Sequence, residues 1–87
     1  MKKKLGFVRA KINYHLTPGE TLKQLRELQG MSQNDLADAT GIPQSNISAL
    51  ENGTRQLGRD RALLLAKALK VHPAVILFPD FDISEVA

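Results

Sequence analysis

Two short helix patterns joined by a tight turn, over residues 33–52, constrain the fold of this chain more than any other feature. Gly41 stands where the chain leaves the first pattern, at a position that favours a positive φ. Ala37 is small where the two helix axes must come close. The apolar residues whose spacing points back toward a core are Leu36, Ile42, Ile47 and Leu50. The stretch therefore predicts a helical hairpin that packs against other helices.

Capping residues and helix breakers predict three further helices. One begins with Pro18, directly after the cap residue Thr17, and ends at Gly30. Another covers roughly residues 60–69, which present a broad apolar face. A short helix occupies residues 73–78, where one proline starts it and a second proline ends it.

The predicted fold class is all-α, a compact five-helix domain over residues 18–79. With 87 residues, the chain has room for one small domain. A strand-like arm over residues 1–17 precedes the domain, because apolar and polar side chains alternate over residues 8–16. A short tail over residues 80–87 is the only other candidate strand. The arm and the tail could pair within one chain or between two, or stay frayed until a partner binds.

The net charge of +3 hides an asymmetry along the chain. Residues 1–19 contain five basic residues and no acidic one, whereas residues 80–87 contain three acidic residues and no basic one. Residues 20–79 carry seven basic and six acidic residues. A basic arm indicates a polyanionic partner, most commonly nucleic acid, although a solvated basic terminus without a partner explains the charge equally well.

The residue types present give no support to an enzyme. The chain has no cysteines, and its two histidines, His15 and His72, lack a metal-binding spacing. The six glycines are scattered, so they form no glycine-rich phosphate loop. We predict no catalytic residue, no metal and no cofactor. The longest apolar run, residues 74–78, is too short to cross a membrane, and a cytoplasmic protein is expected.

A resemblance to a known family lies in residues 32–53, which read S-Q-N-D-L-A-D-A-T-G-I-P-Q-S-N-I-S-A-L-E-N-G. This run resembles the helix-turn-helix of the phage-repressor type, the Cro/C1 or XRE-like family. The Leu-Ala pair, the Gly-Ile turn and the closing Glu-Asn-Gly stand at that family's spacing. The resemblance covers about residues 18–79 and implies a five-helix, lambda-repressor-like domain. It also implies a sequence-specific transcriptional regulator that binds double-stranded DNA, with residues 43–52 as a helix in the major groove.

The resemblance assigns DNA contacts to the outward residues of the hairpin. Small or neutral polar side chains on its second helix can donate and accept hydrogen bonds at base edges. The expected base-reading residues are Gln44, Ser45, Asn46 and Ser48. The expected phosphate-binding residues are Gln33, Asn52, Thr54 and Arg55. The alternative for each is an ordinary solvated helix face.

The resemblance further implies a partly buried ion pair between Arg26 and Glu51, which orients the second helix and touches no base. The alternative is two exposed charges of little energetic consequence. Pro43 departs from the family pattern, because a capping serine or threonine is common at that position. A proline there fits the first turn of a helix instead.

A homodimer is expected, because a single recognition helix makes too few contacts for tight and specific binding. The expected dimer surface is the N-terminal strand, the apolar segment with Val75, Ile76 and Phe78, or both. The alternative function is an antitoxin that also represses its own operon, with the arm and tail binding a cognate toxin protein. A controller protein of a restriction–modification system, a phage lysogeny switch and a purely structural role are the remaining hypotheses.

Overall fold

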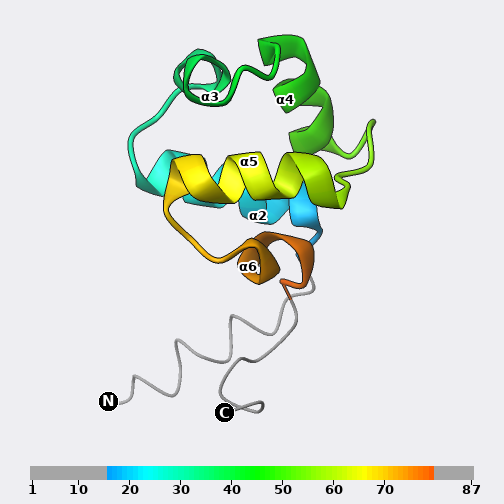
Figure 1. Ribbon diagram of the computed structural model, residues 1–87. Coiled ribbons are helices and arrows are strands. Elements are labelled where there is room, and N and C mark those ends of the chain that lie inside the picture. Colours follow the sequence, from blue (N-terminus) through cyan, green and yellow to red (C-terminus); the bar gives the residue numbers. More distant parts are fainter. Residues whose placement is uncertain (1–15, 80–87) are drawn as a thin grey trace, which may run out of the picture.

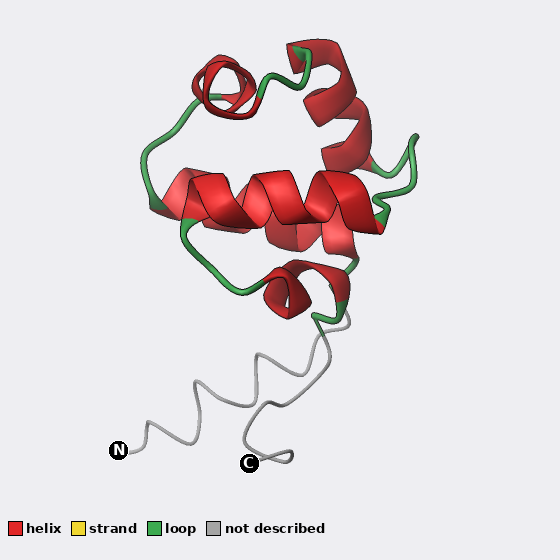
Figure 2. Ribbon diagram, in the orientation of Figure 1, coloured by secondary structure: helices red, strands yellow, loops and turns green. Residues whose placement is uncertain are grey.

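The computed structural model describes residues 16–79 and contains five helices in that range (Figure 1). They are α2 (Pro18–Leu28), α3 (Gln33–Thr40), α4 (Gln44–Asn52), α5 (Arg59–Leu69) and α6 (Pro73–Leu77). The described residues contain no strand, and loops join the helices (Figure 2). The prediction of an all-α, five-helix domain is confirmed. Apart from Leu16, the predicted strand over residues 8–16 and the acidic tail lie outside the described residues.

Side-chain caps determine where α2 and α3 begin. The Thr17 hydroxyl accepts from the backbone N–H of Glu20 at 3.0 Å, and the Glu20 carboxylate accepts from the backbone N–H of Thr17 at 2.9 Å. Ser32 and Asp35 form the same reciprocal pair before α3, at 2.9 Å in both directions. Each capping box satisfies backbone donors that the start of a helix leaves without a partner.

The turn between α3 and α4 depends on Gly41, whose φ of 81° lies in the left-handed region. Its N–H donates to the carbonyl oxygen of Ala37 at 2.8 Å and closes the last turn of α3. Pro43 is the N-cap of α4, with φ −56° and ψ 143°, and no side chain caps this helix. The proline therefore lies one residue before the helix, not in its first turn, because its ψ is that of extended backbone.

The helices enclose one hydrophobic core. Helix α4 packs against α2 and α3, while α5 packs against α3 and α6, and α6 also contacts α2. The largest fully buried side chains are Leu22, Leu36, Ile47, Leu50, Leu65, Leu69 and Ile76. Burial of each such side chain is worth about 1.5–3 kcal/mol relative to exposure. The four core residues expected in the hairpin are all buried, so the core holds α3 and α4 against each other.

Gly19 lies at a very close approach of α2 to α4. It is buried, and a Cβ atom added there would overlap the carbonyl oxygen of Leu50 and lie 2.9 Å from that of Glu51. Only a residue without a Cβ allows the two backbones to come this near. The contact therefore sets the spacing between the helices that carry Arg26 and Glu51.

One residue that was predicted to lie on the dimer surface is buried inside the domain instead. Ile76 is fully buried in the core, so its side chain has no surface to offer to a second subunit. The helix turns Ile76 inward, whereas Val75 is half-buried. Phe78 is 60% exposed and lies just beyond the helix as its C-cap. Only Val75 and Phe78 of the predicted apolar surface are open to a partner.

Candidate nucleic-acid interface

The outer face of α4 carries the four residues that were expected to read bases. Gln44 and Ser45 are exposed in the first turn, and Asn46 and Ser48 are half-buried. Residues four apart lie on the same side of a helix, so Gln44 and Ser48 share one side. The apolar residues of α4 face the core. The structure therefore leaves all four polar residues at least partly open to solvent on one short helix.

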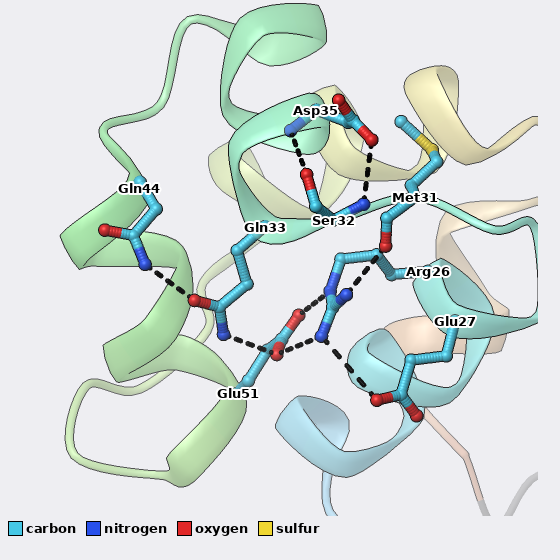
Figure 3. A network of polar contacts seen from close by, with 8 residues as sticks. All are labelled: Arg26, Glu27, Met31, Ser32, Gln33, Asp35, Gln44 and Glu51. Carbon is cyan, nitrogen blue, oxygen red and sulfur yellow. Dashed lines mark hydrogen bonds and ion pairs between the residues drawn. The ribbon is translucent and has the colours of Figure 1, made fainter.

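A series of polar contacts runs from α2 through α3 to the exposed start of α4 (Figure 3). The Arg26 guanidinium donates to both carboxylate oxygens of Glu51, from Nε at 2.7 Å and from Nη2 at 3.0 Å. Gln33 Nε2 donates to Glu51 Oε1 at 2.9 Å, and Gln44 Nε2 donates to Gln33 Oε1 at 2.6 Å. We name Arg26, Glu51, Gln33 and Gln44 the polar relay. It ties an exposed amide on α4 to a buried ion pair.

The ion pair at the base of the polar relay is buried. The side chains of Arg26 and Glu51 are 9% and 3% exposed. Arg26 Nη1 also donates to the carbonyl oxygen of Met31 at 2.7 Å. The hydrogen bonds to Glu51 raise the pKa of the Arg26 guanidinium, and this effect exceeds the opposing effect of burial. The pair implied by the family resemblance is thus present, in the bidentate geometry that best offsets desolvation.

Gln33 bridges the start of α4 and the buried Glu51, a pairing that its sequence position does not predict. Its side-chain amide accepts from Gln44 and donates to Glu51, which leaves one N–H for another acceptor. A glutamine at the start of a helix is equally compatible with full solvation, so its type alone does not reveal this pairing. The only available signal is that two glutamines begin helices on either side of one tight turn.

The turn after α4 holds the other expected phosphate ligands. Asn52 Oδ1 accepts from the Thr54 N–H at 2.9 Å and from the Thr54 hydroxyl at 2.5 Å. These bonds close the turn around Gly53, which has a φ of 85°. Asn52, Thr54 and Arg55 are all exposed. Because the Asn52 oxygen is occupied, the N–H groups of its amide remain to donate elsewhere.

An open depression of about 210 Å³ lies between α2, α3 and α4. It is lined by Lys23, Gln33, Ser48, Glu51 and Asn52. Three residues that were expected to contact DNA therefore come together in space. Lys23 joins them from α2 although its sequence position indicated no such role. Helix α6, which carries the apolar surface, lies on the other side of the domain from α3 and α4 (Figure 1).

Residues 16–79 offer neither a metal site nor a membrane-spanning helix. No group of three or more His, Cys, Asp or Glu side chains in this range could hold a metal ion. His72 instead caps α6, because its Nδ1 accepts from the N–H of Ala74 at 3.0 Å. No helix within the same range is long and apolar enough to span a membrane.

The cap of α3 predicts a pH-dependent stability. Hydrogen bonds from the backbone and then the hydroxyl of Ser32 hold the pKa of the Asp35 carboxyl below its ordinary range. A pKa lowered by folding stabilises the protein above the ordinary value of about 3.9, and this contribution is lost as the pH falls through the folded value. We expect Asp35→Ala to lower the Tm at pH 7, and the difference from the unmodified protein to shrink below about pH 4.

Thermal unfolding followed by circular dichroism between pH 2 and pH 7 checks this prediction. Asp38→Ala is the matched control, because it removes an exposed carboxylate from the same helix without touching the cap. A Tm difference for Asp35→Ala that is the same at both ends of the pH range contradicts the expectation.

The sequence of this chain is similar to a known protein family and to several curated proteins. A family model described as helix-turn-helix matches residues 22–76, which include the whole polar relay. An uncharacterised HTH-type transcriptional regulator of Sinorhizobium fredii is 38% identical over 56 residues, which are 64% of this chain and 39% of that protein. The HTH-type transcriptional repressor RghR of Bacillus subtilis is 35% identical over 69 residues, 78% of this chain and 51% of that protein. The chain spans about half, or less, of the length of these curated relatives.

Two solved structures share the fold over most of the chain. The P22 c2 repressor, solved in complex with a synthetic operator, has a TM-score of 0.70 and 26% identity, covering 76% of this chain and 100% of that one. The restriction–modification controller protein C.AhdI of Aeromonas hydrophila has a TM-score of 0.67 and 31% identity. The match covers 78% of this chain and 98% of that one. With the family model matching well over half of the sequence, the chain belongs to the Cro/C1, or XRE-like, family of helix-turn-helix proteins.

Proposed function

We propose that this protein regulates transcription by binding a specific sequence of double-stranded DNA as a homodimer, with α4 of each subunit in the major groove. The observation that carries the proposal is the exposed amide of Gln44, which the polar relay holds at the start of α4. The P22 c2 repressor, which shares the fold, was solved on an operator. Repression is the expected direction of regulation, since RghR is named as a repressor.

The chemistry of Gln44 suits adenine. One N–H of its amide already donates to Gln33 Oε1. The second N–H can donate to adenine N7 while Oε1 accepts from the adenine N6 amino group, which is the bidentate pairing typical of glutamine in the major groove. Holding the amide in place beforehand reduces the side-chain entropy lost on binding.

The other residues of the interface divide into base contacts and backbone contacts. Ser45, Asn46 and Ser48 are short, so they let α4 approach the base edges closely, and their polar groups both donate and accept. Thr54 and Arg55, which follow α4 and are exposed, are assigned to phosphates. Phosphate contacts set the register of the protein on the duplex without reading its sequence.

Dimerisation places two copies of α4 in successive major grooves, about 34 Å apart. The apolar surface of Val75 and Phe78 supports it, because burial against a second copy removes this surface from water. The surface lies away from α3 and α4, so it stays accessible when DNA is bound (Figure 1). A footprint with two inverted half-sites supports the dimer, and a single half-site bound by a monomer contradicts it.

The decisive experiment is selection of bound duplexes from a random pool, repeated with Gln44→Ala. We expect the unmodified protein to select one sequence, and the variant to lose its preference at one base pair per half-site. A bidentate contact is worth about 1–3 kcal/mol of discrimination, so affinity for the selected site falls about 5- to 150-fold per contact. Non-specific affinity stays nearly unchanged, because the phosphate contacts remain.

Gln24→Ala is the matched control, since Gln24 is an exposed glutamine on α2 outside the depression. It is expected to select the same sequence as the unmodified protein. A uniform loss of affinity for all sequences in Gln44→Ala moves Gln44 from base reader to backbone contact. If the unmodified protein binds no duplex at low salt, the proposed function fails.

A second candidate role is that of a controller protein for a restriction–modification system. The likeness to C.AhdI favours it, because the match covers 98% of that chain at 31% identity. This role uses the same DNA contacts and differs in the genes regulated, so neighbouring genes for an endonuclease and a methyltransferase distinguish it. The relatives are named as regulators, a repressor and a controller protein, and they give no support to the antitoxin hypothesis.

A further inference from the structure

We propose that Lys23, on α2, binds a phosphate of the DNA backbone in the depression between α2, α3 and α4. This inference rests on the proposed function and adds a contact from a helix to which the family resemblance assigned only an ion pair. The depression is lined by Lys23, which carries an ammonium group, and by the polar residues Gln33, Ser48 and Asn52. Among residues 16–79, no other lysine or arginine lines it.

The size of the depression favours one small anionic group. Its volume is about 210 Å³, and it is open to solvent. Pockets that enclose a drug-sized ligand are larger, roughly 300–1,000 Å³, and mostly apolar. A shallow polar site on the flank of a groove-binding helix matches a phosphodiester, which runs along the edge of the groove.

The charges around the depression leave Lys23 uncompensated. Glu51 also lines the site, but both of its oxygens accept from Arg26, and Oε1 accepts from Gln33 as well. The ion pair is neutral overall, so its carboxylate does not repel an incoming anion strongly. Both ion pairs recorded within residues 16–79 involve Arg26, which leaves the exposed Lys23 without an acidic partner in that range. Lys23 therefore gives the depression a positive charge that no ion pair within residues 16–79 neutralises.

Neutral hydrogen-bond donors lie beside Lys23 in the residues that line the depression. Asn52 Oδ1 is occupied by Thr54, so the Asn52 amide offers its N–H groups. Gln33 also retains one N–H after donating to Glu51. A cation with several N–H donors beside it is the arrangement that a phosphate requires.

Holding one phosphate from three helices fixes how α4 enters the groove. Lys23 comes from α2, Gln33 from α3 and Asn52 from α4. The contact therefore sets the register of the whole domain on the duplex and carries no base preference of its own. Lys23 is thus expected to contribute affinity and salt dependence, whereas Gln44 contributes sequence preference.

The test compares Lys23→Gln with Lys67→Gln on the duplex selected by the unmodified protein. Lys67 is an exposed lysine on α5 that does not line the depression, so its variant controls for the loss of one positive charge. We expect Lys23→Gln to bind about tenfold more weakly per subunit contact, and its slope of log affinity against log salt to fall by about 0.9 per subunit. Its base preference is expected to be unchanged.

Ethylation interference identifies the phosphate itself. One phosphate per half-site should interfere with binding of the unmodified protein and of Lys67→Gln, but no longer with binding of Lys23→Gln. Lys23→Arg should restore most of the salt slope, because it restores the charge. The inference is overturned if Lys23→Gln and Lys67→Gln have the same slope and the same interference pattern. That result leaves the proposed function intact, which fails separately if the unmodified protein shows no binding or no base preference.

Discussion

Replacing Glu51 with alanine is expected to lower the free energy of unfolding by about 3–5 kcal/mol. The substitution removes the acceptor of two hydrogen bonds from Arg26 and one from Gln33. The guanidinium, whose side chain is 9% exposed, then loses its buried carboxylate partner and keeps only the solvent-exposed carboxylate of Glu27 at 3.9 Å. An uncompensated buried charge is among the most destabilising changes in a protein. Domains of this kind have a total stability of about 5–15 kcal/mol, so much of it is lost.

Glu27→Ala is the matched control for Glu51→Ala. Glu27 lies 3.9 Å from Arg26, but its side chain is 56% exposed, so its removal is expected to cost less than about 1 kcal/mol. The double variant Arg26→Met, Glu51→Leu is expected to be more stable than Glu51→Ala, because it leaves no buried charge. Urea unfolding followed by circular dichroism measures all three. Equal costs for Glu27→Ala and Glu51→Ala contradict the structure.

Gly19→Ala is the second substitution with a large expected effect. The new Cβ would overlap the carbonyl oxygen of Leu50, and both groups are attached to backbone that cannot rotate away. The two helices must move apart, at the upper end of the roughly 1–3 kcal/mol typical of overpacking, or beyond it. The roughly 0.5–1 kcal/mol that alanine gains over glycine inside a helix is too small to compensate. The Tm should therefore fall clearly.

Gly58→Ala provides the control, as the same change in a place with open space. Gly58 is the N-cap of α5 with a φ of −94°, and nothing lies within 4 Å of an added Cβ. We expect its stability to change by no more than about 1 kcal/mol. Similar Tm values for the two alanine variants show that α2 and α4 are not in direct backbone contact. Because α4 carries Gln44, Gly19→Ala should also weaken DNA binding under conditions where it is folded.

The ends of the helices were predictable where the sequence contains residues that start or stop a helix. Thr17 and Ser32 are capping residues and Gly41 is a left-handed turn residue, and each acts within four positions of itself along the chain. Pro43 was placed one residue too far into its helix, because proline is accepted both as a cap and in a first turn. Local rules thus placed helix ends to within about one or two residues, which is the usual ambiguity of such boundaries.

The candidate site was only partly predictable, because its geometry depends on contacts between helices. The ion pair of Arg26 and Glu51 came from the family resemblance, since the two residues are 25 positions apart in the chain. Nothing local to Gly19 showed that α4 lies against it, and nothing local to Lys23 placed it beside Asn52. Ile76 was assigned to a surface because the apolar segment around it is uniform, and only packing decides which of its side chains turns inward.

The hydrogen bond between Gln33 and Gln44 also bears on how such a protein could acquire a new operator in evolution. A mutation at position 44 alone leaves Gln33 Oε1 without its donor and disturbs a network that ends in the core. Under the proposed function, a side chain at position 44 that reads a different base therefore also changes the hydrogen-bond partner of Gln33.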